Sequence, residues 1–114
     1  MNDCIFCKIV EKKIPARIVY EDELVLAFED LNAQAPVHAL IISKKHIATL
    51  LDARDEDLHL FGHIVKVANT IARDRGIAER GYRLVANCNA ESGQSVYHIH
   101  FHILGGRHMQ WPPG

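Results

Sequence analysis

Long hydrophobic runs and an excess of cationic residues are both missing from this sequence of 114 residues. No apolar stretch approaches the roughly 20 residues that a membrane-spanning helix needs, so we expect no membrane partner. Lysine and arginine total 13 against 14 acidic residues, and the formal net charge is -1. This balance argues against nucleic acid as a partner, because the broad basic surface that binds it is absent. Any phosphate group that the protein binds must be held by a local arrangement of side chains.

Cysteine is scarce, and its spacing excludes the usual disulfide frameworks of secreted proteins. The three cysteines are Cys4, Cys7 and the distant Cys88, an odd number without a recognisable pairing pattern. The N-terminus has neither the basic stretch nor the apolar core of a signal peptide. We therefore expect a cytoplasmic protein with reduced thiols, in which Cys4 and Cys7 are available to a metal ion.

Repeats, low-complexity tracts and linkers are absent too, and a hydrophobic content of 48% suffices for one core. We predict a single domain over residues 1–114. Short runs that alternate or are rich in β-branched residues predict strands at residues 17–20, 24–28, 39–43, 82–87 and 98–104. Residues 55–75 repeat apolar side chains at helical spacing and end before Gly76, which predicts a helix. The order predicts an α+β fold, a five-stranded antiparallel sheet with one long helix and a short N-terminal helix.

The long helix carries more apolar surface than one sheet face covers. Its first apolar row consists of Leu58, Phe61, Val65, Ala68 and Ala72, and its second of Leu60, Ile64, Val67 and Ile71. Together the rows cover about half of the helix circumference. A second subunit is the economical cover, so we predict a homodimer, with a thicker monomeric core as the alternative. His59 and His63 fall on the polar arc, and we interpret both as solvated surface histidines.

Near the C-terminus, His98, His100 and His102 alternate with apolar residues. In a strand the three imidazoles would line one face, about 6.6 Å apart, while the apolar side chains enter the core. Strand propensity does not favour histidine, so the pattern indicates function. Two chemistries fit it: zinc ligation, and nucleophilic or acid catalysis at a phosphorus centre.

The flanking residues favour the phosphorus chemistry. A hydrolytic zinc site usually adds a carboxylate base close in sequence, as in His-Glu-x-x-His, and none accompanies this strand. Instead, Ser92, Gly93, Gln94 and Ser95 precede it. Small residues and a glycine can present backbone N–H groups and a hydroxyl to an anion, which suits a phosphate held against His100.

Residues 98–104 resemble the His-x-His-x-His-x-x signature of the histidine triad family, in which x is apolar. Residues 27–30, 34–38, 44–47, 81–83 and 105–114 extend the resemblance, in order and with matching spacing, to the branch called histidine triad nucleotide-binding proteins. The resemblance implies a purine nucleoside phosphoramidase. Such an enzyme hydrolyses AMP–amine conjugates to AMP and an amine through a nucleotidyl-histidine, with no cofactor required for catalysis. A nucleotide-binding regulatory module and a zinc-dependent hydrolase are the alternatives.

The resemblance also implies a role for each residue of the site. The middle histidine, His100, is the nucleophile, His102 contacts the phosphate and the leaving group, and His98 orients them. Ser95 and His38 can relay the proton that the leaving group needs. The nucleotide pocket that the resemblance implies consists of Asp30 for the ribose, Asn87, Gly93, Gln94 and Ser95 for the phosphate, and Phe28, Leu31, Leu40, Ile5, Phe6 and Ile9 for the apolar wall around the base.

Some members of the family with a Cys-x-x-Cys hold a structural zinc ion together with two histidines. The matching residues here are Cys4, Cys7, His46 and His98, and we predict a zinc site on them. The alternative is a pair of reduced cysteines packed near the core, because Cys-x-x-Cys alone is half of a tetrahedral site. With zinc bound, His98 is a ligand and cannot also be a base. The resemblance further implies a homodimer with joined sheets, in which Trp111 lies near the partner's site.

Overall fold

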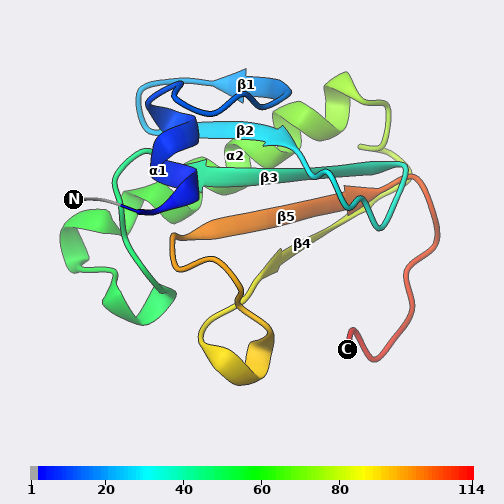
Figure 1. Ribbon diagram of the computed structural model, residues 1–114. Coiled ribbons are helices and arrows are strands. Elements are labelled where there is room, and N and C mark those ends of the chain that lie inside the picture. Colours follow the sequence, from blue (N-terminus) through cyan, green and yellow to red (C-terminus); the bar gives the residue numbers. More distant parts are fainter. Residues whose placement is uncertain (1–2) are drawn as a thin grey trace.

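The computed structural model describes residues 3–114 and consists of two helices, five strands and three short 3-10 helices (Figure 1). In chain order the helices and strands are α1 (Ile5–Val10), β1 (Ile18–Glu21), β2 (Val25–Glu29), β3 (Val37–Ser43), α2 (His59–Asp74), β4 (Tyr82–Ala86) and β5 (His100–Gly105). The 3-10 helices span Leu50–Asp52, Asp55–Asp57 and Ala90–Ser92. Within the described residues, no helix is both long and apolar enough to cross a membrane.

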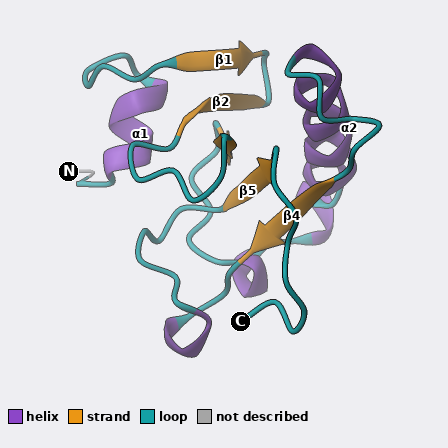
Figure 2. Ribbon diagram, turned by 90° about the vertical axis from the view of Figure 1, so that its right-hand side faces the viewer, coloured by secondary structure: helices purple, strands orange, loops and turns teal. Residues whose placement is uncertain are grey.

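The strands form one antiparallel sheet in the order β1-β2-β3-β5-β4. The strand that carries the histidines, β5, therefore lies inside the sheet between β3 and β4, and β4 is an edge strand. Figure 2 shows α1 on one face of the sheet and α2 on the other. The predicted α+β fold is confirmed, with strand boundaries that differ by one or two residues from those expected.

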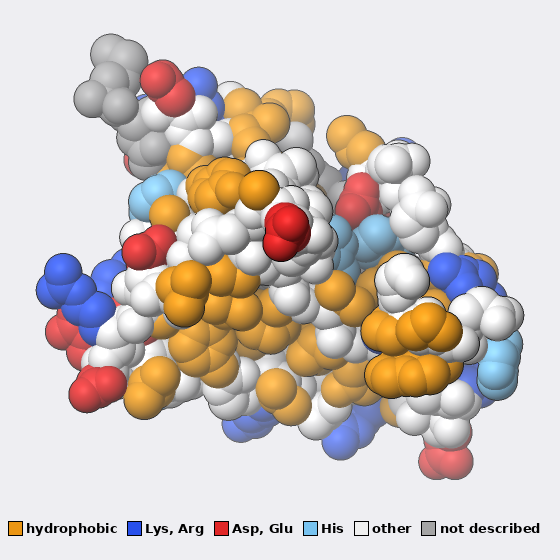
Figure 3. All heavy atoms as spheres, turned by 90° about the horizontal axis from the view of Figure 1, so that it is seen from below, with side chains coloured by type: hydrophobic (Ala, Val, Ile, Leu, Met, Phe, Trp, Pro, Cys, Tyr) orange, Lys and Arg blue, Asp and Glu red, His pale blue; other side chains and the backbone are white. Residues whose placement is uncertain are grey.

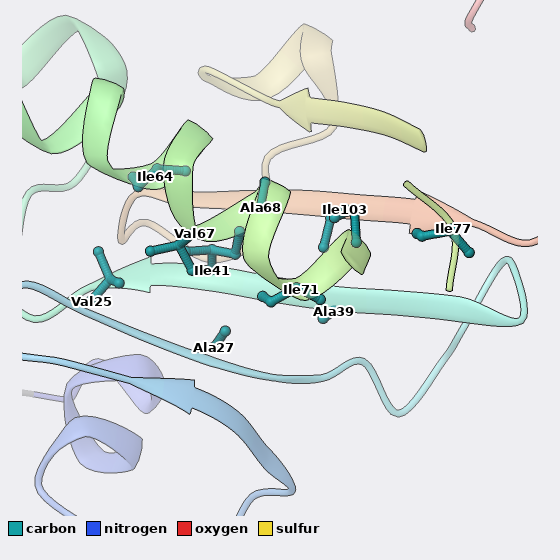
Figure 4. Packing of buried hydrophobic residues seen from close by; sticks show 11 residues of the cluster. Val25, Ala27, Ala39, Ile41, Ile64, Val67, Ala68, Ile71, Ile77 and Ile103 are labelled. Atoms are coloured by element: carbon teal, nitrogen blue, oxygen red, sulfur yellow. The ribbon is translucent and has the colours of Figure 1, made fainter. Parts of the chain in front are cut away.

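The face under α2 contains the larger hydrophobic core (Figure 4). Its buried members are Val25, Ala27, Ala39, Ile41, Ile64, Val67, Ala68, Ile71, Ala72, Ile77 and Ile103. Burial of each large aliphatic side chain contributes about 1.5–3 kcal/mol. Of the two apolar rows predicted for α2, the second is fully buried, whereas Leu58 and Val65 of the first remain 58% and 45% exposed. The sheet thus covers one row and part of the other.

The opposite face has a separate apolar cluster beneath α1. Its buried members are Phe6, Ile9, Leu26, Phe28, Leu40 and Ile42. Because side chains alternate along a strand, Leu40 and Ile42 point to α1 while Ile41 points to α2. This alternation identifies the face on which each β5 side chain lies.

Two expectations about the long helix were wrong in detail. Residues 55–57 form a separate 3-10 turn, and α2 begins at His59. The Asp57 carboxylate caps the start of that turn by accepting the Arg54 N–H (3.0 Å). His63 is not a solvated surface histidine. Its Nε2 contacts Oδ2 of Asp22 at 2.6 Å and its side chain is half-buried, whereas His59 is exposed as expected.

Candidate active site

His100 and His102 lie side by side on the α1 face of β5. In the sheet register His100 is opposite Ile42 and His102 is opposite Leu40, and both of these residues belong to the α1 cluster. The centroids of the two imidazole rings are 5.2 Å apart, and the Phe6 ring packs edge-on against His100 with centroids 5.1 Å apart. Two imidazoles therefore face the same space above the sheet.

His98 lies on the same side of the sheet, as the predicted alignment of three imidazoles requires, and its ring packs against Phe6 with centroids 5.9 Å apart, but it lies outside β5. β5 begins only at His100, because the Ile99 N–H bonds to the Ile47 carbonyl oxygen (2.8 Å) instead of to a neighbouring strand. The predicted strand 98–104 is therefore two residues too long at its start. His98 is turned into a different group of side chains and is fully buried.

The His98 ring is held by a backbone carbonyl on one side and faces sulfur on the other. Nε2 donates a hydrogen bond to the Ser43 carbonyl oxygen at 2.6 Å, so the proton of the neutral ring is on Nε2. Nδ1 then carries a lone pair, and it lies 3.3 Å from Cys4 Sγ, 3.5 Å from Cys7 Sγ and 3.1 Å from His46 Nδ1. Burial lowers the pKa of His98, which keeps Nδ1 unprotonated.

These four residues fit a tetrahedral zinc ion. Their donor atoms all lie within 4.8 Å of one another. Zinc bonds of about 2.3 Å to sulfur and about 2.0–2.1 Å to nitrogen separate neighbouring donors by roughly 3.3–3.8 Å, close to the contacts of His98. The carbonyl on Nε2 is the kind of second contact that fixes a ligating imidazole. The sequence prediction named the same four residues.

The tautomer of His100 is fixed by the backbone of His98. His100 Nδ1 donates to the His98 carbonyl oxygen at 2.7 Å. The neutral imidazole can carry only one proton, so its other nitrogen, Nε2, has a lone pair. His100 thus has the form that a nucleophile requires.

His102 is oriented by His38, which in turn is oriented by the loop before β3. The Gln34 N–H donates to His38 Nδ1 (3.0 Å), so the proton of His38 is on Nε2. That nitrogen lies 2.9 Å from His102 Nδ1 and 3.3 Å from Asp30 Oδ2. With Nδ1 accepting from His38, His102 carries its own proton on Nε2. This histidine therefore presents a donor, whereas His100 presents a lone pair.

Burial keeps both members of this pair neutral. It lowers the pKa of His102 to about 4, with further lowering by His100 and His38 and a smaller opposing effect of Asp30. Burial also lowers the pKa of His38, again against Asp30. At neutral pH these imidazoles act through their single N–H groups and not as cations.

The residues predicted for the apolar wall of the nucleotide pocket divide into two sets. Phe6, Ile9, Phe28 and Leu40 are each 6–7% exposed and belong to the cluster under α1. Ile5 is 47% exposed and Leu31 is 98% exposed. The first set forms the floor beside His100, and the second offers apolar surface to a ligand.

In the loop before β5, two of the backbone N–H groups expected to bind phosphate donate hydrogen bonds within the loop instead. The Gly93 N–H donates to Ala90 and the Gln94 N–H to Asn89, both within the loop. The Gln94 amide is buried, and its Nε2 donates to the carbonyl oxygens of residues 48 and 96. Ser95, in contrast, makes no hydrogen bond within residues 3–114, and Asn87 is half-buried just after β4. Ser95 therefore has a hydroxyl and an N–H to offer to an anion.

The positions of the ring nitrogens show whether the three triad histidines could bind one zinc ion together. Over the described part of the chain, two donor groups come within 4.8 Å: the Cys4 group already described, and Asp30 with His38 and His102. The three triad imidazoles do not form such a group, because the His98 nitrogens face the Ser43 carbonyl on one side and Cys4, Cys7 and His46 on the other. The geometry therefore does not fit the zinc-dependent hydrolase considered from sequence.

Backbone groups complete the site, and the sequence analysis did not name them. The carbonyl of Ser43 fixes the His98 ring, and the N–H of Gln34 fixes the His38 tautomer. No residue-type signal marks such positions, because every non-proline residue has the same N–H and C=O groups.

Comparison with known proteins identifies the family. A family model described as "Scavenger mRNA decapping enzyme C-term binding" matches residues 3–111. An uncharacterised HIT-like protein of Synechocystis is 54% identical over 113 residues, which cover 99% of this chain and 98% of the relative. This chain belongs to the histidine triad (HIT) family. The HIT-like protein of Synechococcus elongatus is 53% identical over the same length and the same shares.

Solved HIT structures have the same fold. A HIT family hydrolase from Legionella pneumophila superposes with a TM-score of 0.96 at 54% identity, covering 98% of this chain and 100% of that one. A histidine triad protein from Clostridium difficile gives a TM-score of 0.93 at 45% identity, with 96% of each chain covered. The five-stranded sheet and the two helices described above are thus the HIT fold.

Proposed function

We propose that this HIT protein is a purine nucleoside phosphoramidase that hydrolyses AMP–amine conjugates to AMP and an amine. One observation carries the proposal: an imidazole with a lone pair on Nε2, His100, lies beside an imidazole with a proton on Nε2, His102, with ring centroids 5.2 Å apart. A nucleophile and a hydrogen-bond donor at this spacing suit displacement at phosphorus.

In the first step, His100 Nε2 attacks the phosphorus atom. A bond from phosphorus to His100 forms while the bond to the amine nitrogen breaks. The positive charge that develops on the imidazole is stabilised by the hydrogen bond from Nδ1 to the His98 carbonyl. The His102 N–H stabilises the phosphoryl oxygen or the departing nitrogen. The nitrogen leaves as an amine with a proton that comes from water.

In the second step, water attacks the nucleotidyl-histidine. The phosphorus–nitrogen bond to His100 breaks, the nucleotide phosphate gains the hydroxyl, and His100 regains its lone pair. The other proton of the attacking water goes to solvent, and it replaces the proton that the amine took up in the first step. His38 holds His102 in the donor tautomer through both steps, since its own proton lies on Nε2. No cofactor takes part in either step.

Nucleotide recognition in this proposal uses the groups next to His102. Asp30 would accept hydrogen bonds from the ribose hydroxyls. One of its oxygens already accepts the Asn32 N–H (2.8 Å), and a carboxylate retains further acceptor sites. Leu31 and Ile5 would cover the purine base, and Ser95 would donate to the phosphate.

The test is acid quench of the enzyme during turnover of adenosine 5'-phosphoramidate, followed by mapping of the adduct. We expect AMP release and a nucleotidyl group on His100. The variant His59→Ala is the matched control, because His59 is exposed on α2, and it should give the same adduct at the same level. An adduct on another residue, or no AMP release by folded protein, contradicts the proposal.

We also propose that Cys4, Cys7, His46 and His98 hold a structural zinc ion. The ion would link α1 to the segments around residues 46 and 98, which the polar contacts of the four side chains already bring together. Elemental analysis should give close to one zinc per chain. Less than about a tenth of an equivalent, unchanged after incubation with zinc, would contradict it.

For the homodimer, we propose an interface built on the β4 edge and the adjacent flank of α2. β4 pairs with β5 alone, and the Tyr82 hydroxyl bonds to Asn69 Oδ1 (2.6 Å), which brings α2 alongside this edge. Leu58 and Val65 are exposed on α2. Viewed from the β4 side, hydrophobic side chains gather over this face (Figure 3). A dimer would cover both features.

Light scattering at micromolar concentration tests the interface. We expect twice the chain mass for the wild type and the single chain mass for Val65→Asp. The control Lys66→Asp changes the charge of the neighbouring exposed residue and should remain dimeric. A monomeric wild type excludes the dimer, and with it a role for Trp111 at the partner's site.

A further inference from the structure

A hollow of about 530 Å³ lies outside the site described above, where the start of β4 meets the segment after β5. We call it the arginine hollow, because Arg80, Arg83 and Arg107 line it together with His108. Figure 1 shows the two segments at the same end of the sheet, and Tyr82 pairs with Gly105 there. Gly106, at φ 94°, also lines the hollow and directs the chain around it without a side chain of its own.

The charge of the arginine hollow is uncompensated. No aspartate or glutamate lines it. Within residues 3–114 none of its three arginines forms an ion pair, although Arg17 and Arg75 both pair with Glu29. The whole chain has a formal net charge of -1, so its surface is not generally basic. The three guanidinium groups therefore create a positive potential at this one place.

Two of the guanidinium groups are held in place by neutral partners. Arg107 donates from Nε to the Gln34 carbonyl (2.9 Å) and from Nη1 to the His108 carbonyl (3.1 Å). Arg83 donates to the Gln110 carbonyl (3.0 Å) and lies over the Trp111 ring, 6.0 Å from its centroid. Each guanidinium has five N–H groups, so both keep donors for an anion.

The sheet register places Arg83 on the same face as His102. Val85 is opposite His102 on the neighbouring strand, and Arg83 is two residues before Val85 and opposite Leu104. Residues two apart share a face, and diagonal neighbours across two strands are about 7–8 Å apart. Arg107 is linked to the site as well, because Gln34, whose carbonyl it contacts, donates its N–H to His38.

From this arrangement we propose that the arginine hollow binds an anionic group, a carboxylate or a phosphate, on the leaving portion of the substrate. The inference rests on the proposed function, since it assigns the hollow to the part of the conjugate that departs from phosphorus. His102 contacts the reacting phosphoryl group in the proposed mechanism, and Arg83 lies one strand further out on the same face. Guanidinium groups bind carboxylates and phosphates alike through paired hydrogen bonds. The structure therefore does not choose between these two anions, and the experiment below distinguishes them.

The experiment compares AMP linked through nitrogen to three amines of similar length: β-alanine, its uncharged amide, and phosphoethanolamine. For the wild type we expect kcat/KM to be at least about tenfold higher with one of the anionic conjugates than with the amide. The identity of that conjugate distinguishes carboxylate from phosphate. Arg83→Gln should reduce the preference by about tenfold, and Arg83→Lys should restore part of it.

The control variant is Arg73→Gln, which removes an exposed cation on α2 and should keep the wild-type preference. Equal kcat/KM for all three conjugates in active wild type overturns the inference, and so does a preference that Arg83→Gln leaves unchanged. A wild type that hydrolyses none of the three contradicts the proposed function instead. Binding is then measured separately by titrating inorganic phosphate and acetate and following the amide signals of Gly81 and Gly106. Shifts in the wild type that Arg83→Gln abolishes support an anion site, and their absence overturns it.

Discussion

Two groups of imidazoles lie close together in this molecule and differ in what their ring nitrogens contact. His98 places one nitrogen on a backbone carbonyl and the other among two sulfur atoms and His46. His102, four residues later, places Nδ1 against His38, with the Asp30 carboxylate nearby. The first group contains the sulfur and nitrogen donors that zinc prefers, and the second contains an oriented proton donor. In each histidine, the hydrogen bond at one ring nitrogen fixes the tautomer, and the tautomer determines whether the other nitrogen carries a proton or a lone pair.

The largest effect on activity is expected at His100, which lies between the two groups. His100→Ala should abolish AMP release, because the covalent route has no other nucleophile. Binding of AMP should change by less than about threefold, since Asp30 and the apolar floor remain. Steady-state kinetics and calorimetric AMP binding measure the two properties. Turnover within tenfold of the wild type would rule out His100 as the nucleophile.

Next in size is the loss of the donor group. His102→Ala should lower kcat/KM by about 10²- to 10⁴-fold, the range for a group that assists proton movement or stabilises charge. His38→Gln should cost less, because a glutamine N–H can replace the donor to His102. Measured with adenosine 5'-phosphoramidate, the reverse order of these two effects would contradict the assigned tautomers.

The zinc group should affect stability much more than catalysis. Cys4→Ser combined with Cys7→Ser should remove zinc and lower the melting temperature by at least about 5 °C, while kcat/KM at 25 °C stays within about threefold. The reason is that the carbonyl of His98, and not its ring, contacts His100. Elemental analysis, calorimetry and kinetics provide the three readings. Cys88→Ser is the control and should change none of them.

The smallest effect is a shift in titration. Because burial lowers the pKa of His102 to about 4, its imidazole signals should move near pH 4 in an NMR titration and not near the free value of about 6.5. The folded pKa is below the unfolded one, so this group's contribution to the free energy of unfolding is complete above about pH 6.5 and is lost as the pH falls towards 4. His102→Gln should therefore weaken the acid dependence of stability. Titration at the free value would contradict the burial described for His102.

Local patterns in the sequence predicted most of the fold. The alternation of Ile99, Phe101 and Ile103 with histidines indicated a strand, and the spacing of apolar residues through Ile64 and Ile71 indicated the long helix. Both signals depend on a periodicity that the chain imposes wherever one face is buried. The strand order, with β5 between β3 and β4, did not come from such patterns, since it depends on pairings between distant segments.

The site was predicted in part. The resemblance brought together Cys4, Cys7, His46 and His98, which the structure also brings together, although zinc binding remains a prediction. It did not give the start of β5 at His100, because the Ile99 N–H bonds to the Ile47 carbonyl and not to a neighbouring strand. Arg83 and Arg107 entered the sequence analysis only as part of the resemblance and were given no role, since they are distant along the chain and meet only when β4 pairs with β5.

The bond from His100 to the carbonyl of His98 has an evolutionary consequence. A carbonyl oxygen is present whatever the side chain, so a substitution at position 98 leaves the acceptor for His100 in place. Loss or gain of Cys4 and Cys7, and with them of the proposed zinc site, would then leave the orientation of His100 unchanged. Homologues that lack Cys4 and Cys7 but keep His100 and His102 would be the expected record of such changes.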